Sequence, residues 1–256
     1  MIKIEGKKFD WFGLTQILKE HKGKLRQIRM LSVNELKKKY KGAALGPIWA
    51  LIKPTFTLFI LWFAFEIGLK RNGGVHFING KYTQFVFMLT GYVPWFYISE
   101  CIVGGSRSIR SNKQFVTKLS FPVSNIMTFT SLSGLYSHIL LCAIMYVVLL
   151  CLGFGPSIYN LQFIYYALMM YFFFLVLSWM TAPLSAFSKD FENLINSVIT
   201  GLFWLSGIFW NTYDISPLWL RKLMYFNPIN YFVNGYRKSF LTDTFIFDSN
   251  YTTETM

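Results

Sequence analysis

The longest uncharged stretch of the chain, residues 119–188, reads LSFPVSNIMTFTSLSGLYSHILLCAIMYVVLLCLGFGPSIYNLQFIYYALMMYFFFLVLSWMTAPLSAFS. It contains no Asp, Glu, Lys or Arg, whereas about a quarter of the residues of an ordinary soluble protein are charged. As one helix it would be about 105 Å long, but about 20 residues suffice to cross a bilayer core. The turn sequence Gly153-Phe-Gly-Pro-Ser157 divides it. We therefore expect two membrane-spanning helices, at about 122–152 and 159–187.

Three further apolar segments flank this stretch, at about residues 45–69, 82–104 and 194–212. Each is long enough to cross the hydrocarbon core. Together with the first two they predict an all-α, polytopic integral membrane protein with about five transmembrane helices. The bundle occupies residues 44–213 and includes a loop at 105–121.

The composition excludes several other classes of protein. Hydrophobic residues make up 54% of the 256 residues and charged residues 14%, which excludes a disordered chain. The formal net charge of +13 does not predict nucleic-acid binding, because the basic residues cluster beside the apolar segments. Most of them lie inside the cell if the N-terminus does, so we expect a multi-pass protein of the cytoplasmic membrane with a cytoplasmic N-terminus.

Residues 1–43 are predicted to form helices on the cytoplasmic membrane surface. Apolar residues recur at helical spacing over 14–28, which predicts an amphipathic interface helix broken at Gly23. Ser32 and Glu35 form an S-x-x-E capping box, so a second helix is expected to start just after Ser32. Four basic residues near its end could attract lipid phosphates or a diphosphate: Lys37, Lys38, Lys39 and Lys41.

The loop at 105–121 is predicted to contain a short helix. Ser111 and Gln114 form another capping-box pattern, which predicts a helix over about 112–119. This helix has a basic side and an apolar side, the latter formed by Phe115, Val116 and Leu119. Two interpretations remain open: the loop contacts lipid headgroups, or its apolar residues dock into a cytoplasmic partner.

Residues 214–241 are aromatic but carry four basic residues. Ser216-Pro217 and Asn227-Pro228 each place a good N-cap before a proline, which predicts two short helices. Such a segment fits a re-entrant or interfacial hairpin on the outer face better than a lipid-exposed span. A sixth span at about 223–241 is the alternative, and residues 242–256 are expected to form a polar tail.

Catalytic motifs are absent from the sequence. It contains no P-loop, no G-x-S-x-G, no H-E-x-x-H and no repeated metal-ligand spacing, so no catalytic residue, metal or cofactor is predicted. An enzyme acting on lipid-linked sugars would need Lys189, Asp190 and Glu192 to hold a metal or phosphate, but carboxylates two residues apart do not share a helix face. An ion-coupled transporter would normally carry intramembrane carboxylates or related repeats, and neither is evident.

Four short motifs occur in order along the chain. They are Tyr40-Lys-Gly-Ala-Ala-Leu-Gly-Pro-Ile-Trp-Ala50 with Lys53-Pro54, Lys118-Leu-Ser-Phe-Pro122, Ser188-Lys-Asp190, and Asn227-Pro228 with Gly235-Tyr-Arg237. Together they resemble the membrane permeases of ABC-type polysaccharide exporters over about residues 10–241. The residues at 204–210 and 235–237 look most similar to wall teichoic acid exporters, with O-antigen and capsule exporters as alternatives.

This resemblance implies a homodimeric permease that works with two copies of a separate ABC ATPase, which binds the ATP. The substrate would be a polysaccharide on a polyprenyl diphosphate lipid, moved to the outer face. The resemblance also implies an ATPase-coupling element at Arg110, Lys113, Phe115, Lys118, Phe121 and Pro122, and a cytoplasmic motif at Lys189 and Asp190. Family members have a sixth span, whereas this chain ends at Met256, so five spans would leave the C-terminus outside.

Aromatic side chains would line the path of the polymer. Sugar rings present C–H faces that pack on aromatic rings without a fixed orientation, so a chain could slide along them. Most aromatic residues are nevertheless expected to face lipid or the membrane interface. The candidates for the path are Tyr92, Trp95, Tyr136, Trp204 and Trp210.

Overall fold

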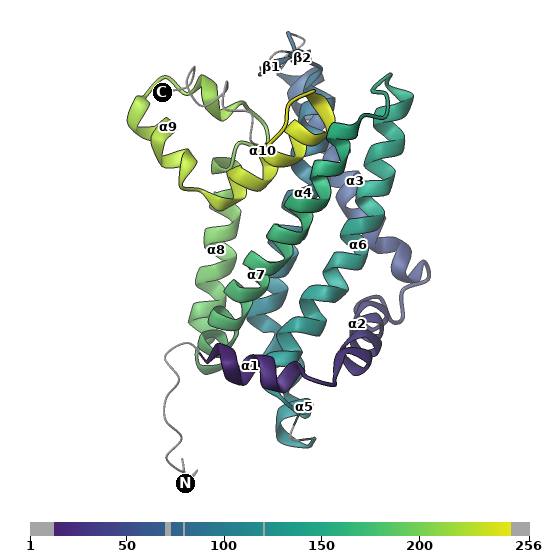
Figure 1. Ribbon diagram of the computed structural model, residues 1–256, viewed down its shortest axis with the longest axis vertical. Helices are drawn as coiled ribbons and strands as arrows, with labels where there is room; N and C mark the ends of the chain where they lie inside the picture. The colour runs from purple at the N-terminus through teal and green to yellow at the C-terminus, as the bar shows by residue number, and fades with distance from the viewer. Residues whose placement is uncertain (1–12, 70–72, 79, 120, 247–256) are drawn as a thin grey trace.

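The computed structural model of the chain describes residues 13–69, 73–78, 80–119 and 121–246 (Figure 1). Regular structure in this part is helical apart from one antiparallel pair, β1 (Val75–Phe77) with β2 (Gly80–Tyr82). The predicted all-α membrane fold is therefore confirmed. Residues 1–12 of the expected surface segment and 247–256 of the expected polar tail lie outside the described residues.

The long helices run between two ends of the molecule (Figure 1). They are α3 (Trp49–Trp62), α4 (Gln84–Ser111), α6 (Val123–Cys151), α7 (Gln162–Phe187) and α8 (Lys189–Leu205). Single turns lie beside them at Gly46–Ile48, Phe63–Gly68, Ile158–Leu161 and Thr212–Asp214. One end, the basic end, carries α1 (Leu14–His21), α2 (Leu25–Lys39) and α5 (Lys113–Thr117). The opposite end, the hairpin end, carries β1, β2, α9 (Leu218–Tyr225) and α10 (Pro228–Leu241).

Four helical segments of the described chain are long and apolar enough to cross a membrane: Gly46–Gly68, Gln84–Ser111, Val123–Cys151 and Ile158–Phe187. They match four of the five expected spans. The fifth, expected at 194–212, differs because α8 begins earlier, where Ser188 caps the amide of Asp190 (3.2 Å), and ends at Leu205. The chain then turns at Gly207, whose φ of 64° favours glycine. The apolar residues after it are buried in a loop, so the expected helix does not continue through them.

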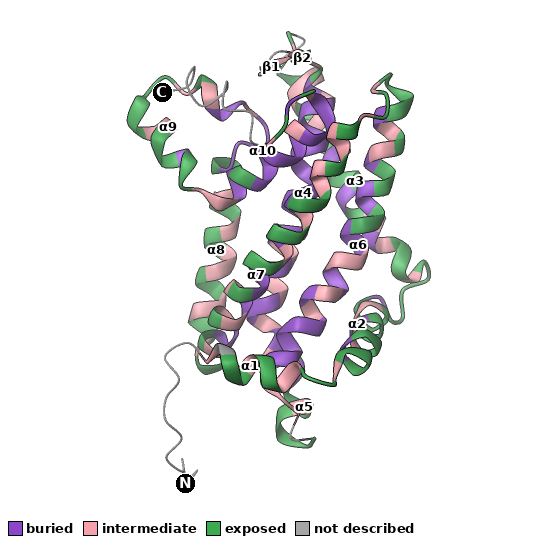
Figure 2. Cartoon of the chain, viewed as in Figure 1, coloured by how far each residue is buried: buried purple, intermediate pink, exposed green. Residues whose placement is uncertain are grey.

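Helix α4 lies at the centre of the bundle and is mostly buried (Figure 2). α6, α7, α8 and α10 all pack against it. Its first turn is capped by Thr83, whose hydroxyl accepts a hydrogen bond from the Val86 amide (3.4 Å). Near its other end, a Cβ atom on Gly105 would lie 2.7 Å from the Cβ of Ser178 in α7. The small residue therefore allows close contact between these two helices, as is common in membrane bundles.

Helix α2 differs from the sequence-based expectation. Gly23 separates α1 from α2 with a φ of 77°, as predicted. However, α2 is continuous over Leu25–Lys39, so the capping box expected at Ser32 is wrong. Ser32 is fully buried, and its hydroxyl lies within hydrogen-bond distance of the Arg29 carbonyl (2.8 Å) and of the Tyr136 hydroxyl (3.2 Å). The contact with Tyr136 of α6, a residue distant in sequence, explains why this serine lies within α2 and not at a helix start.

The expected pair of short helices is present over residues 218–241. The Asn227 side chain accepts a hydrogen bond from the first turn of α10 (2.9 Å), and Pro228 opens that helix, as predicted. At the start of α9 the expected cap Ser216 makes no such bond. α10 is largely buried against α4 and α7 (Figure 2). Because α9 and α10 are separate helices, the alternative of one span over 223–241 is not formed.

Arg237 holds α10 in the bundle. Its guanidinium is fully buried and donates to the backbone oxygens of Gly207 (2.7 Å), Ile208 (2.7 Å) and Phe87 (3.3 and 3.2 Å) and to Asn234 Oδ1 (3.0 Å). It also lies over the Phe87 ring, 3.5 Å from the centroid. The cation is thus stabilised by carbonyl dipoles and a π face, and it joins α10 to α4 and to the loop after α8.

Candidate functional site

A cavity of about 700 Å³ lies at the basic end, between α2, α4 and α6. Its charged lining residues are Glu35, Lys38, Lys39, Lys53, Glu100 and Arg107. Hydroxyl groups line it as well, from Ser99, Ser108, Ser111, Thr130, Ser131 and Ser133. We call this the basic cavity, because its basic side chains outnumber its acidic ones. Ammonium, guanidinium and hydroxyl donors together suit an anion with several oxygen atoms, such as a phosphate group.

Helix α2 supplies two of the lysines and is fixed to α4 through them. Lys39 forms an ion pair with Glu100, and Lys38 donates to Asn112 Oδ1 (3.0 Å) and lies 3.6 Å from Glu35. Burial alone would lower the pKa of Lys39, but the charge of Glu100 and its hydrogen bond outweigh burial and raise this pKa above its ordinary value. Lys39 is therefore charged at neutral pH.

Lys53 and Arg107 add two further positive charges to the lining. Arg107 Nε lies 2.6 Å from a carboxylate oxygen of Glu192, the first-turn acid of α8. Lys53 lies in α3, and it forms no ion pair with any described residue. Its charge is consequently free to bind an anion in the cavity.

Two hydroxyl groups of the lining are buried without a partner. Neither Ser108 Oγ nor Thr130 Oγ1 makes a hydrogen bond within the described part of the chain. A buried polar group without a partner costs about 1–3 kcal/mol. Both residues belong to the lining, but their oxygens are closed off from the cavity, so the case for an anionic occupant rests on the basic side chains.

The structure brings together only part of the predicted lysine cluster. Lys38 and Lys39 line the basic cavity, whereas Lys37 and Lys41 are exposed and lie outside its lining. Sequence reasoning missed the contribution of Lys53 and Arg107. Each lies close to the basic end of a predicted span, which is the signal that could have revealed them.

Helix α5 presents a different apolar face from the one expected. Phe115 points inward, and its ring centroid lies 5.4 Å from that of Phe121 and 5.8 Å from that of Phe129 in α6. The exposed apolar side chains are Val116 and Leu119, which are 38% and 64% exposed. A partner that docks on α5 would meet these two residues, while Phe115 holds the loop on the bundle.

The other proposed coupling residues take different positions around α5. Arg110 is bound within the chain, where it donates to the Ser185 carbonyl and lies 3.5 Å from Glu192. Pro122 caps α6, directly after Phe121. The exposed basic residues of the loop are Lys113 and Lys118, and those of the nearby α8 start include Lys189 beside Asp190. Arg107 and Arg110 of α4 thus bind α8 through Glu192. The position of Glu192 in the sequence did not suggest this role.

Four of the five aromatic candidates belong to one array between α4 and α8. The Phe203 ring lies 6.4 Å from Tyr92 and 5.4 Å from Trp95, and it contacts Phe209 at 4.9 Å. Phe209 in turn lies 5.2 Å from Trp204 and 6.2 Å from Trp210. The fifth candidate, Tyr136, is separate from this array, because it lies in α6 and accepts the hydrogen bond from Ser32 at the basic end.

An exposed polar stripe runs along α8 beside the array. Its members recur at helical spacing and are Asn193, Ser197, Thr200, Gly201 and Trp204. Ser197 and Thr200 donate to carbonyl oxygens of their own helix, four residues back (3.1 and 2.9 Å). No heavy atom lies within 4 Å of a Cβ built on Gly201, so the stripe borders open space. Polar groups at membrane depth favour a protein or water environment over lipid.

Comparison with known proteins gives consistent results. The profile of the family described as ABC-2 type transporter matches residues 26–241. The O-antigen export system permease protein RfbA of Myxococcus xanthus is 24% identical over 207 residues, which cover 80% of this chain and 76% of that protein. A protein of the same name from Klebsiella pneumoniae is 25% identical over 225 residues, which cover 84% and 80% of the two chains.

Proposed function

The chain belongs to the ABC-2 type transporter family, and we propose that it is the membrane-spanning subunit of an ATP-driven exporter of lipid-linked polysaccharide. The relatives named as O-antigen export permeases support this substrate class. In this proposal the chain forms a homodimer, has no enzymatic activity of its own and works with a dimer of ABC ATPase subunits that bind ATP. The N-terminus and the basic end then face the cytoplasm.

The basic cavity is the observation that carries the proposal. A polyprenyl diphosphate headgroup has several anionic oxygens, and Lys38, Lys39 and Lys53 could pair with them at the cytoplasmic membrane surface. The headgroup would thus be held in the cavity while the polymer waits to enter the path.

The polar stripe and Trp204, the exposed ring of the aromatic array, define the proposed path, whereas Tyr92 and Trp95 are buried within the chain. In a homodimer, the stripes of two α8 helices would face each other across the polymer, which removes polar side chains from lipid. Rings such as Trp204, 46% exposed, would pack on the C–H faces of sugars without holding them in one orientation. Weak, repeated contacts of this kind permit a long chain to slide.

The identity of the exported polymer is a more specific part of the proposal. The motifs at 204–210 and 235–237 resemble those of teichoic acid exporters, whereas the related proteins found are named for O-antigen. We infer an O-antigen-type glycan as the first candidate and teichoic acid as the second. A polymer rich in phosphate and a neutral glycan differ in charge, so a competition assay separates the two.

Association with an ATPase tests the proposal. The chain would be co-expressed with the ATPase of a polysaccharide exporter and purified by a tag on the chain. Val116→Asp places a charge on the exposed apolar face of α5, so we expect it to abolish co-elution of ATPase activity. Leu223→Asp is the matched control, because Leu223 is 56% exposed on α9 at the other end of the molecule. Loss of co-elution in both variants, or in neither, would contradict the assignment of α5.

A further inference from the structure

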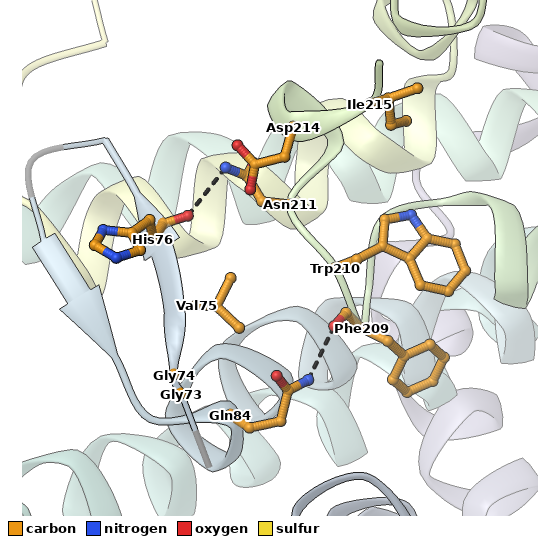
Figure 3. A pocket seen from close by; sticks show the side chains of 10 residues that line it. All are labelled: Gly73, Gly74, Val75, His76, Gln84, Phe209, Trp210, Asn211, Asp214 and Ile215. Carbon is orange, nitrogen blue, oxygen red and sulfur yellow. Dashed lines mark hydrogen bonds between the residues drawn. The ribbon is translucent and has the colours of Figure 1, made fainter. Parts of the chain in front are cut away.

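A second cavity, which we call the hairpin cavity, lies at the hairpin end (Figure 3). It lies between β1, the first turn of α4 and the loop that follows α8, and has a volume of about 460 Å³. Binding sites for small molecules measure about 300–1,000 Å³. Its lining residues are Gly73, Gly74, Val75, His76, Gln84, Phe209, Trp210, Asn211, Asp214 and Ile215.

One wall of the hairpin cavity is aromatic. Phe209 is fully buried and fixed by stacking on Phe65, 5.2 Å between centroids, and by the edge contact with Phe203. Trp210 is half-buried beside it, and its indole N–H makes no hydrogen bond with the described residues. Because these contacts cover the Phe209 ring, Trp210 alone offers the cavity an apolar face with a free donor, a combination that tryptophan gives at many binding sites.

The polar groups around the cavity are held in place by backbone contacts. Gln84 is 2% exposed, and its Nε2 donates to the Phe209 carbonyl (2.9 Å), which leaves its Oε1 without a partner in the described chain. Asn211 donates to the His76 carbonyl (3.0 Å) and caps the turn that ends at Asp214 (Figure 3). The exposed Asp214 carboxylate forms no ion pair with a described residue.

These free groups are complementary to a sugar ring. A hexose has an apolar C–H face that packs on an indole, and hydroxyls around its rim that can donate to a carboxylate on one side and to an amide oxygen on another. No heavy atom of the described residues lies within 4 Å of a Cβ built on Gly73, so the cavity is open there, whereas a Cβ on Gly74 would lie 2.8 Å from the Tyr82 carbonyl oxygen of β2. Asp214 is the one acidic residue of the lining, and its carboxylate would repel a phosphate group.

We propose that the hairpin cavity binds one neutral hexose ring of the exported glycan. The assignment rests on the proposed function, because only an exporter of polysaccharide would present a glycan at this end of the molecule. Trp210 would stack on the ring, and Asp214 with Gln84 Oε1 would accept from its hydroxyls. The cavity would thus hold the sugar as it leaves the path and slow its return.

Saturation-transfer NMR tests this assignment directly. The whole chain would be placed in lipid nanodiscs, with the methyl glycosides of glucose, galactose and mannose as neutral probes and glycerol 3-phosphate as the anionic probe. Irradiation of aromatic protons should transfer magnetisation to the C–H protons of at least one glycoside. We expect Asp214→Asn and Trp210→Leu to weaken that binding at least threefold. Their matched controls, Asp243→Asn and Trp219→Leu, change exposed residues outside the cavity and should leave it unchanged.

The outcomes separate this assignment from the proposed function. No transfer to any glycoside, equal weakening by the control variants, or tighter binding of glycerol 3-phosphate would overturn the hairpin cavity as a neutral-sugar site. Co-elution with the ATPase is measured on the same preparation. If the chain co-elutes with the ATPase but binds no glycoside, only the assignment of the hairpin cavity is wrong. If a folded chain binds glycosides but does not co-elute with the ATPase, the transporter proposal is contradicted.

Discussion

Arg237→Met removes the cation that joins α10 to α4 and to the loop after α8. The carbonyl oxygens of Gly207 and Ile208 then lose their donors in a place that water does not reach, whereas the Phe87 carbonyl keeps the Thr90 hydroxyl as a donor (3.2 Å). The contact of the cation with the Phe87 ring, worth about 2 kcal/mol when desolvated, is lost as well. Each such orphaned carbonyl costs about 1–3 kcal/mol. Removal of the guanidinium also returns its desolvation cost, which amounts to several kcal/mol for a buried ion. We therefore expect a net loss of about 3 kcal/mol from the free energy of unfolding.

Thermal unfolding followed by tryptophan fluorescence measures this loss. One kcal/mol corresponds to about 2–4 °C for a chain of this length, so the midpoint should fall by about 6–12 °C. Arg221→Met is the control, since the side chain of Arg221 makes no hydrogen bond with a described residue of the same hairpin end. Arg237→Lys keeps the charge but not the planar fork, and should recover only part of the loss. If the Arg237→Met and Arg221→Met variants have the same thermal midpoint, Arg237 does not stabilise the bundle in this way.

Three other predictions follow from the contacts at the basic end. Lys53→Gln should weaken the binding of farnesyl diphosphate about fivefold, measured by calorimetry, which corresponds to about 1 kcal/mol. Lys37→Gln should leave the affinity unchanged. Equal effects of the two substitutions would exclude the basic cavity as the binding site for the diphosphate. Gly105→Val should lower the unfolding free energy by about 1–3 kcal/mol, because its Cβ would collide with Ser178; an unchanged thermal midpoint would contradict that contact. Glu192→Gln should lower the free energy by about 1 kcal/mol through its two partly exposed arginine pairs, and high salt should erase the difference from the unaltered chain.

Local signals in the sequence predicted much of the fold. The uncharged stretch, with its single turn sequence, predicted two long helices, and a proline after Asn227 predicted the start of α10. Glycine at position 23 ended α1 because its backbone adopts a positive φ. Each of these features depends on residues within one or two helical turns, so the pattern alone determined the outcome.

Features that depend on distant contacts were not predictable in this way. Ser32 matched a capping pattern, but its bond to Tyr136 places it inside α2. Phe115 matched an exposed apolar face, but its contacts with Phe121 and Phe129 leave it only half-exposed. For the candidate site, the sequence predicted two cavity lysines but not the residues of α3 and α4 that complete the lining, because only the packing of helices brings them together.

Transport by the reconstituted complex tests the central proposal most directly. The chain and its ATPase would be placed in lipid vesicles that carry a fluorescent oligosaccharide on polyprenyl diphosphate, and the fraction of label that reaches the opposite leaflet would be measured. We predict ATP-dependent movement that disappears when the ATPase carries a defective P-loop or when the chain is omitted. An intact complex that hydrolyses ATP but leaves the labelled lipid in its original leaflet would contradict the account.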